Sequence, residues 1–526
     1  MTTRPAGWRA VWHALRARRT AAVTLLSFSS GLPLGLVWIA IPTWLAQEGV
    51  DIKVIGLFTL AQAPWTFKFV WSPLMDRYAL PVPRLRGKLG WALATQVALL
   101  GLTLWLARLA VHPDSVWVIA SVALAIAFAS ASQDIAVDAY AVEVLRPEEQ
   151  GVAVGARTAL YRAAMFTAGG LAITLAGTWS WPGVFVALAI TYVPMLVATA
   201  SAPTPDPGDV AAPRTLREAV WEPFVGFLAV PRAWEMLAFV VLYKLADNLA
   251  GALVRPFLVQ VGFNNVDVGV ATATIGLFAT LAGTFVGGAL TTGLGLGHAL
   301  WLFGALQILS NMGYVAVAVV GLNRPVMYAA MGFESLTTGM GTGAFGVLLL
   351  RMTQKRFSAT QYALFSSLFA LPRLLSGPVT GVLVDAIGWR DFFVVTMAVG
   401  LPGMVMLQRF CPVGAREPRL ESDAAPSGPA VSLPGLMARG LLGAIGAWAC
   451  AALTIAALAG MKAVHNDPHA SFDLLSRLAD LAAPHTWGAW AQLAGIVLFG
   501  LVVGLAVAAT AAARSGVRPP TDQPIA

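Results

Sequence analysis

Long apolar segments, separated by short stretches rich in Pro, Gly and charged residues, repeat along the whole chain. About 20 apolar residues make a helix that spans the hydrocarbon core of a bilayer. Twelve segments reach this length before residue 411, namely 21–46, 54–74, 89–109, 115–142, 151–177, 181–201, 234–260, 267–291, 297–320, 325–350, 358–386 and 388–410. Two more, 433–461 and 487–513, follow a polar stretch. The pattern predicts an all-α polytopic membrane protein with fourteen spanning helices.

The longest polar interruption among the first twelve segments, residues 202–232, divides them into two sets of six. The sets share a weak repeat, because LAQEGVDIKVIG at 45–56 aligns without gaps with LVQVGFNNVDVG at 258–269. Two like-oriented six-helix halves with a substrate site between them are typical of the major facilitator superfamily fold. The expected parts are a first half at 1–201, a linker at 202–232, a second half at 233–410, a linker at 411–432, two added helices at 433–513 and a tail at 514–526.

Composition agrees with a membrane protein, because 58% of the 526 residues are hydrophobic and only 11% are charged. A soluble domain carries about 25% charged residues. The net charge of +8 would suggest nucleic acid as the partner of a soluble chain, but here most Lys and Arg lie in alternate loops, on the side of the N-terminus. The positive-inside rule therefore places both termini in the cytoplasm, with lipid and no nucleic acid as the expected surroundings.

The fourth segment ends in an unusually polar sequence, SASQDIAVDAYAVEVL at 130–145. Asp134 and Asp138 are four residues apart, so both carboxylates project from one face of a helix. An Asp at the centre of a membrane helix costs about 2.5–3.5 kcal/mol on insertion, so two on one face are expected to meet water, partners or protons. We interpret them as proton-coupling residues of a transport pathway; the alternative is a structural pair that binds a basic neighbour.

Several cations also lie inside predicted segments. Lys68, in segment 2, is expected to pair with an acid. Segment 7, VLYKLADNLAGALVRPFLVQ, places Lys244, Asn248 and Arg255 on one helical stripe, with a break expected at Pro256. Two basic residues on a cavity face favour an anionic substrate; the alternative is a neutralised Lys244–Asp247 pair plus an Arg255 at the outer interface. The same choice applies to two further arginines, Arg162 beside Tyr161 and Arg373 after Pro372.

Segment 2 ends at Asp76 and Arg77, followed by a basic loop. We expect these two residues to form a gate at the cytoplasmic side and not to bind substrate. Segment 1 carries Ser27, Ser29 and Ser30 before Gly31 and Pro33, which predicts an irregular helix. In segment 10 a Gly-rich run follows Glu334, which is typical of close helix packing.

The sequence lacks common motifs of ATP-driven and hydrolytic proteins. It contains no Walker A sequence, no G-x-S-x-G elbow and no H-E-x-x-H motif, which disfavours an ATP-driven pump or an intramembrane hydrolase of those kinds. His465 and His469 have a spacing that can bind metal, but an exposed loop is the better interpretation. Cys411 and Cys450 are too few for a disulfide framework. We expect no enzyme activity, no metal and no cofactor.

The sequence resembles the AmpG family of muropeptide permeases. The matching stretches are FSSGLPLGL at 28–36, GLFTLAQAPWTFKFVWSPLMDRY at 56–78, SASQDIAVDAY at 130–140, LYKLADNLAGAL at 242–253, TTGMGTGAF at 337–345 and KRFSATQYALFSSL at 355–368. The resemblance implies a proton-driven symporter of the bacterial inner membrane that imports N-acetylglucosaminyl-anhydro-N-acetylmuramyl peptides for peptidoglycan recycling and so feeds β-lactamase induction. Where the family pattern has Arg or Lys after D-A-Y, this chain has Ala141, so a cation beside Asp138 is expected to be missing.

The candidate substrate-binding residues follow from these segments and the resemblance: Ser29, Gln133, Tyr140, Tyr161, Arg162, Lys244, Asn248, Arg255 and Arg373. Their mixture of arginines, tyrosines and amides suits carboxylates and sugar rings. Two other hypotheses stay open from the sequence. One is a carrier of a different anionic cargo, such as an acyl-coenzyme A, and the other is a membrane-embedded sensor or scaffold that uses the same fold.

Overall fold

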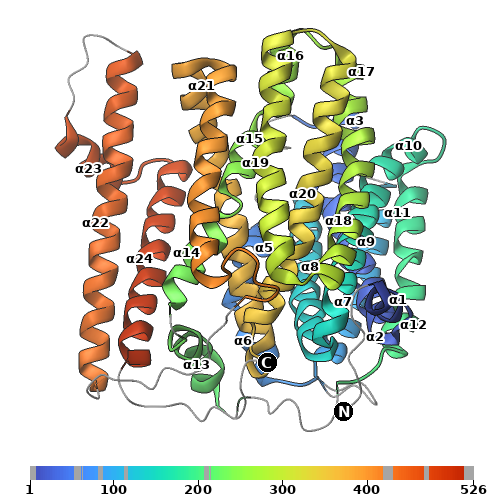
Figure 1. The fold of residues 1–526 in the computed structure, drawn as a ribbon, viewed down its shortest axis with the longest axis horizontal. Coiled ribbons are helices and arrows are strands. Elements are labelled where there is room, and N and C mark those ends of the chain that lie inside the picture. The colour runs from blue at the N-terminus through green and yellow to red at the C-terminus, as the bar shows by residue number, and fades with distance from the viewer. Residues whose placement is uncertain are drawn as a thin grey trace. The chain divides into compact units, whose positions relative to one another are not determined.

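A computed structural model describes residues 8–51, 61, 63–80, 87–111, 116–205, 213, 215–230, 232–418, 431–466 and 473–514. All secondary structure within these ranges is helical, which confirms the predicted fold class (Figure 1). Eleven helices in the described residues are long and apolar enough to cross a membrane. The predicted count of fourteen stays a prediction, because segment 2 lies partly outside the described residues, segment 10 is not among the eleven, and segments 11 and 12 run together as one helix.

The first half, through residue 205, consists of long helices with several irregular turns. Its elements are α1 (Trp8–Arg16), α2 (Arg18–Gly35), η1 (Leu36–Ala40), α3 (Ile41–Gln47), α5 (Ala63–Phe67), η3 (Lys68–Val70), α6 (Ser72–Arg77), α7 (Lys88–Leu109), α8 (Val116–Val144), α9 (Pro147–Phe166), η4 (Thr167–Leu171), α10 (Ala172–Ala176), α11 (Trp181–Ile190) and α12 (Tyr192–Ala200). The expected irregularity of segment 1 is present as the π-helical turn η1, shortly after Pro33. A core of apolar side chains that includes Trp44 and Phe185 holds this half together.

The second half repeats the plan. Its elements are α14 (Ala233–Leu242), α15 (Leu245–Ala252), α16 (Val254–Val261), α17 (Asn265–Gly269), η5 (Val270–Ile275), α18 (Gly276–Leu294), α19 (Leu296–Val320), α20 (Arg324–Met352), η6 (Lys355–Phe357) and α21 (Ser358–Phe410), with α13 (Leu216–Leu228) before them. Within α21, Gly388 has φ 76°, so the helix is interrupted there, between predicted segments 11 and 12. A second apolar core, with Phe257, Tyr314 and Phe393, lies in this half.

Segment 7 is broken just before Pro256, as expected, and also at a second place. The chain leaves the helix at Tyr243 and Lys244, between α14 and α15, and again at Leu253, between α15 and α16. Pro256 lies in the first turn of α16, where a proline is tolerated, and the break precedes it because its ring clashes with the carbonyl four residues earlier. The predicted common stripe of Lys244, Asn248 and Arg255 therefore does not exist as one continuous helix face.

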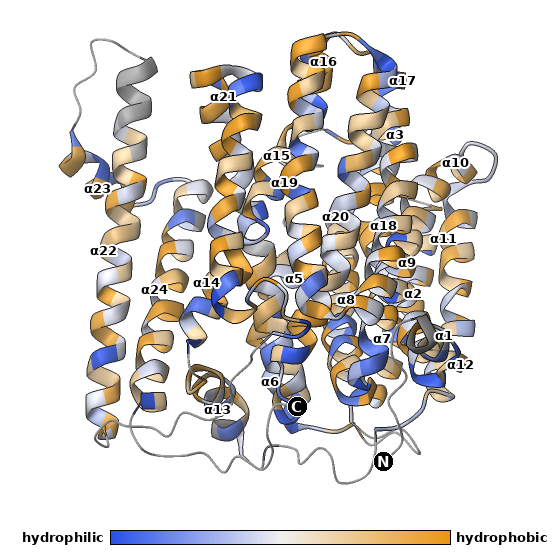
Figure 2. Ribbon diagram, in the orientation of Figure 1, coloured by the Kyte–Doolittle hydropathy of each residue, from blue (hydrophilic) through white to orange (hydrophobic). Residues whose placement is uncertain are grey.

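The described residues of 220–234 and 431–514 form a compact unit of their own, apart from the two halves. This unit contains α22 (Leu433–Asn466), α23 (Leu474–Ala482) and α24 (Trp487–Arg514). Helices α22 and α24 cross closely where Gly440 meets Gly504. His469 and the side chain of His465 lie outside the described part of the chain. Figure 2 shows the apolar residues that run along the long helices.

Candidate functional site

Asp138 on α8 is held by two cations. Its carboxylate lies 3.3 Å from the Lys68 Nζ atom and also accepts a hydrogen bond from the Arg157 guanidinium. The exposed fraction of the Asp138 residue is only 9%. The expected pairing of Lys68 with an acid is therefore present, and Asp138 belongs to a buried cluster with charges of both signs.

Arg157 corrects the sequence analysis. The sequence analysis did not single out Arg157, and Ala141 suggested that Asp138 has no cation beside it. Instead α9 begins at Pro147, so Arg157 lies almost three turns inside the helix, on the side that faces α8. A basic residue inside the predicted segment 151–177 was the available signal. Arg157, together with Lys68, supplies the positive charge that Ala141 does not.

Asp134 lies one turn from Asp138 on α8, but its surroundings differ. Its residue is also 9% exposed, and it forms no ion pair within the described residues. Ser30, Lys68 and Arg157 are its nearest electrostatic partners apart from Asp138. Of the two acids predicted to couple protons, Asp134 is the one whose carboxylate is not committed to a salt bridge.

Three predicted substrate-binding residues are buried and bonded to the protein. Ser29 is fully buried, accepts hydrogen bonds from the Gln96 and Gln133 side chains and donates one to the Leu26 carbonyl. Tyr140 is 0% exposed and donates to the Pro203 carbonyl at 2.7 Å. The Ser29 hydroxyl and the Gln133 amide nitrogen link α2, α7 and α8, and Tyr140 bonds to the chain beyond α12. All three side chains are engaged within the protein, and substrate binding by them stays a prediction.

Segment 7 shows the neutralised pair that was the alternative interpretation. The Lys244 Nζ atom lies 2.9 Å from the Asp247 carboxylate, and the Asn248 amide donates to the Lys244 carbonyl at 2.8 Å. Arg255 is exposed on α16. Lys244 and Asn248 thus stabilise the broken helix, and neither they nor Arg255 form a common cationic face.

Arg162 and Arg373 form an unusual pair, which we call the arginine pair. They come from α9 in the first half and α21 in the second, and they repel each other electrostatically. Neither makes a hydrogen bond or ion pair with an acid within the described residues. Tyr161, next to Arg162, faces Asp134 and Asp138. Guanidinium groups suit carboxylates, which they bind with two parallel hydrogen bonds, and in the described part of the chain no acid is bound to this pair.

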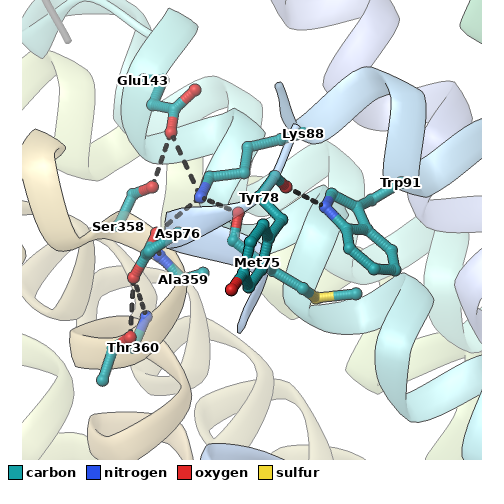
Figure 3. Close-up of polar contacts among 9 residues, drawn as sticks. All are labelled: Met75, Asp76, Tyr78, Lys88, Trp91, Glu143, Ser358, Ala359 and Thr360. Atoms are coloured by element: carbon teal, nitrogen blue, oxygen red, sulfur yellow. Dashed lines mark hydrogen bonds and ion pairs between the residues drawn. The ribbon is translucent and has the colours of Figure 1, made fainter. Parts of the chain in front are cut away.

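Asp76 joins the two halves (Figure 3). Its carboxylate lies 2.5 Å from the Lys88 Nζ atom. On the other side it accepts hydrogen bonds from the Ala359 and Thr360 backbone amides, at 3.1 and 2.8 Å, and from the Thr360 hydroxyl at 2.7 Å. These amides belong to the first turn of α21, whose N–H groups lack intrahelical partners and attract an anion. Asp76 therefore caps a helix of the opposite half.

The same end of the bundle contains more contacts between the halves, and we call this region the seam. Ser358 donates to the Glu143 carboxylate at 2.6 Å, and Glu143 lies 4.0 Å from Lys88 (Figure 3). Lys88, which we grouped with the loop cations, is 7% exposed. The partner of Asp76 is therefore Lys88; Arg77 donates instead to the Pro213 carbonyl at 3.3 Å.

Helices α9 and α18 pack backbone to backbone in the seam. A Cβ atom on Gly288 would lie 2.4 Å from the Gly151 carbonyl oxygen, so no larger residue fits without moving the helices. The Val152 amide donates to the Thr292 hydroxyl at 3.0 Å. Helix α1 covers this crossing, because Val11 and Ala14 pack against Val152 of α9 and Ala289 of α18. The seam thus combines charges, small residues and an added helix.

Comparisons with known proteins agree with this architecture. Residues 23–377 match the Major Facilitator Superfamily. The chain is 42% identical over 391 residues to the anhydromuropeptide permease of Escherichia coli K12, a match that covers 74% of this chain and 79% of that protein. The chain is a member of the AmpG family of the Major Facilitator Superfamily. A putative transporter AmpG 4 of Rickettsia felis is 29% identical over 400 residues, covering 74% of this AmpG-family chain and 95% of the relative.

Solved structures share the fold of this AmpG-family protein. The human organic anion transporter MFSD10 superposes with a TM-score of 0.54 at 13% identity, over 74% of this chain and 99% of that one. A bacterial homologue of the iron transporter ferroportin gives a TM-score of 0.53 at 13% identity, over 74% and 98%. The charged and small residues of the seam, the acids of α8 and the arginine pair lie within the residues that match the superfamily, whereas α1 and α22 to α24 lie outside them.

Proposed function

We propose that this protein is a proton-coupled importer of N-acetylglucosaminyl-anhydro-N-acetylmuramyl peptides in the bacterial inner membrane. The observation that carries the proposal is the 42% identity to a protein named anhydromuropeptide permease, over 79% of its length. Import of these products would serve peptidoglycan recycling and, through it, the induction of β-lactamase. Both termini would lie in the cytoplasm, because basic residues, among them Lys88, Arg146 and Arg351, lie at the seam end of the helices.

The cargo has charges that suit the arginine pair. Its peptide carries carboxylates, and Arg162 and Arg373 offer two guanidinium groups from opposite halves. A carboxylate bound by both would neutralise their mutual repulsion and draw α9 and α21 together. Tyr161 adjoins the pair and offers a ring for stacking on a sugar. We therefore narrow the cargo site to Tyr161, Arg162 and Arg373.

The proton would bind to the cluster on α8. Asp138 is committed to Lys68 and Arg157, so its role is to hold these cations in place. Among the residues that the structure describes, Asp134 has no ion pair, so it can accept a proton without leaving a cation unpaired. Neutralising Asp134 removes the cost of enclosing a bare carboxylate when apolar walls close around it.

The seam would act as the cytoplasmic gate. With the halves joined there, cargo enters from the opposite side, and release into the cytoplasm requires Asp76 to leave the first turn of α21. Alternating access of this kind moves one six-helix half against the other, here residues 1–201 against 233–410. Asp76 and Lys88 are the gate residues, and Arg77 has a supporting contact with the linker.

Vesicle uptake tests the proposal. The assay uses right-side-out vesicles, so that cargo is offered at the outer side. Uptake of labelled anhydro-muropeptide is measured with and without an agent that collapses the proton gradient. We expect accumulation that the agent abolishes and that free sugars, free peptides and an acyl-coenzyme A do not compete away. Accumulation of the thioester instead would assign a different anionic cargo, and binding without accumulation would support a sensor.

A further inference from the structure

Trp38 and Trp65 form a pair of aromatic side chains that the proposed mechanism does not use. Their ring centroids lie 5.9 Å apart, and the ring planes are nearly perpendicular, at 87°. Trp38 lies in the π-helical turn η1 and Trp65 in α5, so the contact joins the first two spanning segments. Both side chains are half-buried. We call these two residues the tryptophan pair.

The indole N–H groups of the tryptophan pair have no acceptor. Both nitrogen atoms are buried, and neither has a hydrogen-bond partner within the described residues. Eight other tryptophans in the described part of the chain donate their indole N–H to a protein oxygen: Trp44, Trp71, Trp91, Trp181, Trp234, Trp301, Trp389 and Trp448. A buried donor without an acceptor costs free energy, so two such donors in one ring pair indicate a place where a ligand supplies the acceptors.

The π-helical turn sets the direction of Trp38. Helix α2 packs on α9 at Gly31, where a side chain would collide with the Tyr161 carbonyl. In a regular helix Trp38 would lie on the same face, because residues seven positions apart are almost in line. The wider turn η1 brings Ile39 against Gly169 of η4 instead, and Trp38 is turned towards its partner ring. The irregular turn therefore creates the tryptophan pair.

The tryptophan pair lies next to the boundary between the two halves. The Thr66 carbonyl, one residue after Trp65, accepts a hydrogen bond from the Ser367 hydroxyl of α21 at 3.1 Å. Arg373 of the arginine pair follows Ser367 by less than two turns on the same helix. The second half thus approaches the tryptophan pair with the helix that carries one of the cargo arginines.

The first half gives a similar spacing. Gly31, which contacts the Tyr161 carbonyl, precedes Trp38 by seven residues, or about 10 Å along a helix. Tyr161 adjoins Arg162, the other member of the arginine pair. The tryptophan pair and the arginine pair are therefore about two helical turns apart, a span that one disaccharide-peptide can cover.

We propose that the tryptophan pair is a subsite for the amino sugars of the cargo, an inference that rests on the proposed function. The indole rings offer flat apolar faces on which the C–H face of a pyranose packs. The two N–H groups donate to hydroxyl or acetamido oxygens of the sugar, which supply the missing acceptors. The arginine pair holds the peptide carboxylates at the other end, so the tryptophan pair selects cargo that carries sugar.

The test compares three labelled ligands on purified full-length protein: the anhydro-muropeptide, its disaccharide without the peptide, and its peptide without the disaccharide. Trp38→Phe and Trp65→Phe each keep an aromatic ring and remove one N–H group. Each variant should raise the Kd of the two sugar-containing ligands by about three- to tenfold, as expected for one lost hydrogen bond. The Kd of the free peptide should stay the same.

Trp71→Phe is the matched control. It makes the same substitution in the same predicted segment, but the Trp71 indole donates to the Ser132 hydroxyl at 3.1 Å and its ring packs on Phe128. This variant should lose more stability than the other two and bind all three ligands normally. An equal loss of sugar affinity in Trp71→Phe, or normal sugar affinity in both variants of the tryptophan pair, overturns the subsite and leaves the proposed function standing. Absence of muropeptide binding by the natural protein overturns both.

A second measurement keeps both indole rings in place. Incorporation of 5-fluorotryptophan at position 38 alone, and in a second sample at position 65 alone, preserves the N–H groups and gives a single fluorine signal in each protein. Each signal should shift when the anhydro-muropeptide or its disaccharide is added, and should not shift with the free peptide. Signals that stay unchanged while the anhydro-muropeptide binds overturn the inference.

Discussion

The seam and the arginine pair both place charged side chains inside the spanning helices, but their charges differ in how many partners the protein provides. In the seam, Asp76 has Lys88, two backbone amides and a hydroxyl as partners. In the arginine pair, two guanidinium groups from opposite halves have no acid bound to them within the described residues. A charge with all its partners holds one conformation together, whereas a charge without them needs a ligand.

The largest effect is expected from Asp138→Asn, which removes the shared anion of Lys68 and Arg157. Breaking a buried ion pair by deleting one partner costs about 3–5 kcal/mol, and here two cations lose their partner at once. We expect a much lower yield and a lower melting temperature in detergent. Asp134→Asn, one turn away and without an ion pair, should remain folded and lose only accumulation. Equal stability of the two variants would contradict the assignment.

Lys88→Ala should come next, because it leaves Asp76 buried in the seam without its cation. A loss of about 3 kcal/mol would shift the equilibrium towards separated halves by at least about a hundredfold. Spin labels on α9 and α18 at the seam would measure the distance distribution, which should move to longer values. Arg77→Ala, whose side chain contacts a linker carbonyl, should leave the distribution in place.

Arg162→Ala tests the arginine pair. Charge-assisted hydrogen bonds contribute about 1.5–3 kcal/mol, so the cargo Kd should rise on the order of 10–100-fold. Melting temperature should stay the same or increase, because a repulsive neighbour of Arg373 has gone. Arg108→Ala, exposed on α7, is the matched control and should bind cargo normally. A large loss of stability in Arg162→Ala would mean that the pair is structural.

The smallest effect is expected from Tyr140→Phe. It removes one hydrogen bond, to the Pro203 carbonyl, which contributes about 0.5–1.5 kcal/mol to folding. Cargo uptake should be unchanged and the melting temperature slightly lower. The opposite result, normal stability with impaired uptake, would return Tyr140 to the cargo site.

The fold and the seam acid could be predicted from the chain because each leaves a local trace. Apolar segments of fixed length give the helices, and Asp76 stands at the end of one. The partner of Asp76 could not be foreseen, since Lys88 is next to loop residues in sequence and its burial depends on contacts with Met75, Asp76 and Glu143. Arg157 was missed for the same reason, because the rotation of α9 against α8 decides whether its side chain faces Asp138.

The polar residues of the predicted cargo site differ in how far they are buried and bonded within the protein, and sequence patterns do not show this difference. Ser29, Gln133 and Tyr140 occur in a family motif, yet their polar groups are used between helices. Lys244 was ambiguous because an acid three residues later can always neutralise it on a helix. Arg162 and Arg373 became stronger candidates for cargo binding for the opposite reason. The fold brings them together without an acid bound to either within the described residues.

Helix α1 rests on one residue from each half, Val152 and Ala289, through Val11 and Ala14. If the seam opens in each transport cycle as proposed, an affinity tag or fluorescent protein fused at the amino terminus would load a joint that has to separate. A truncation that ends near Arg16 would remove the same joint. A tag placed elsewhere, with residues 8–16 kept intact, preserves the natural balance between the two closed ends.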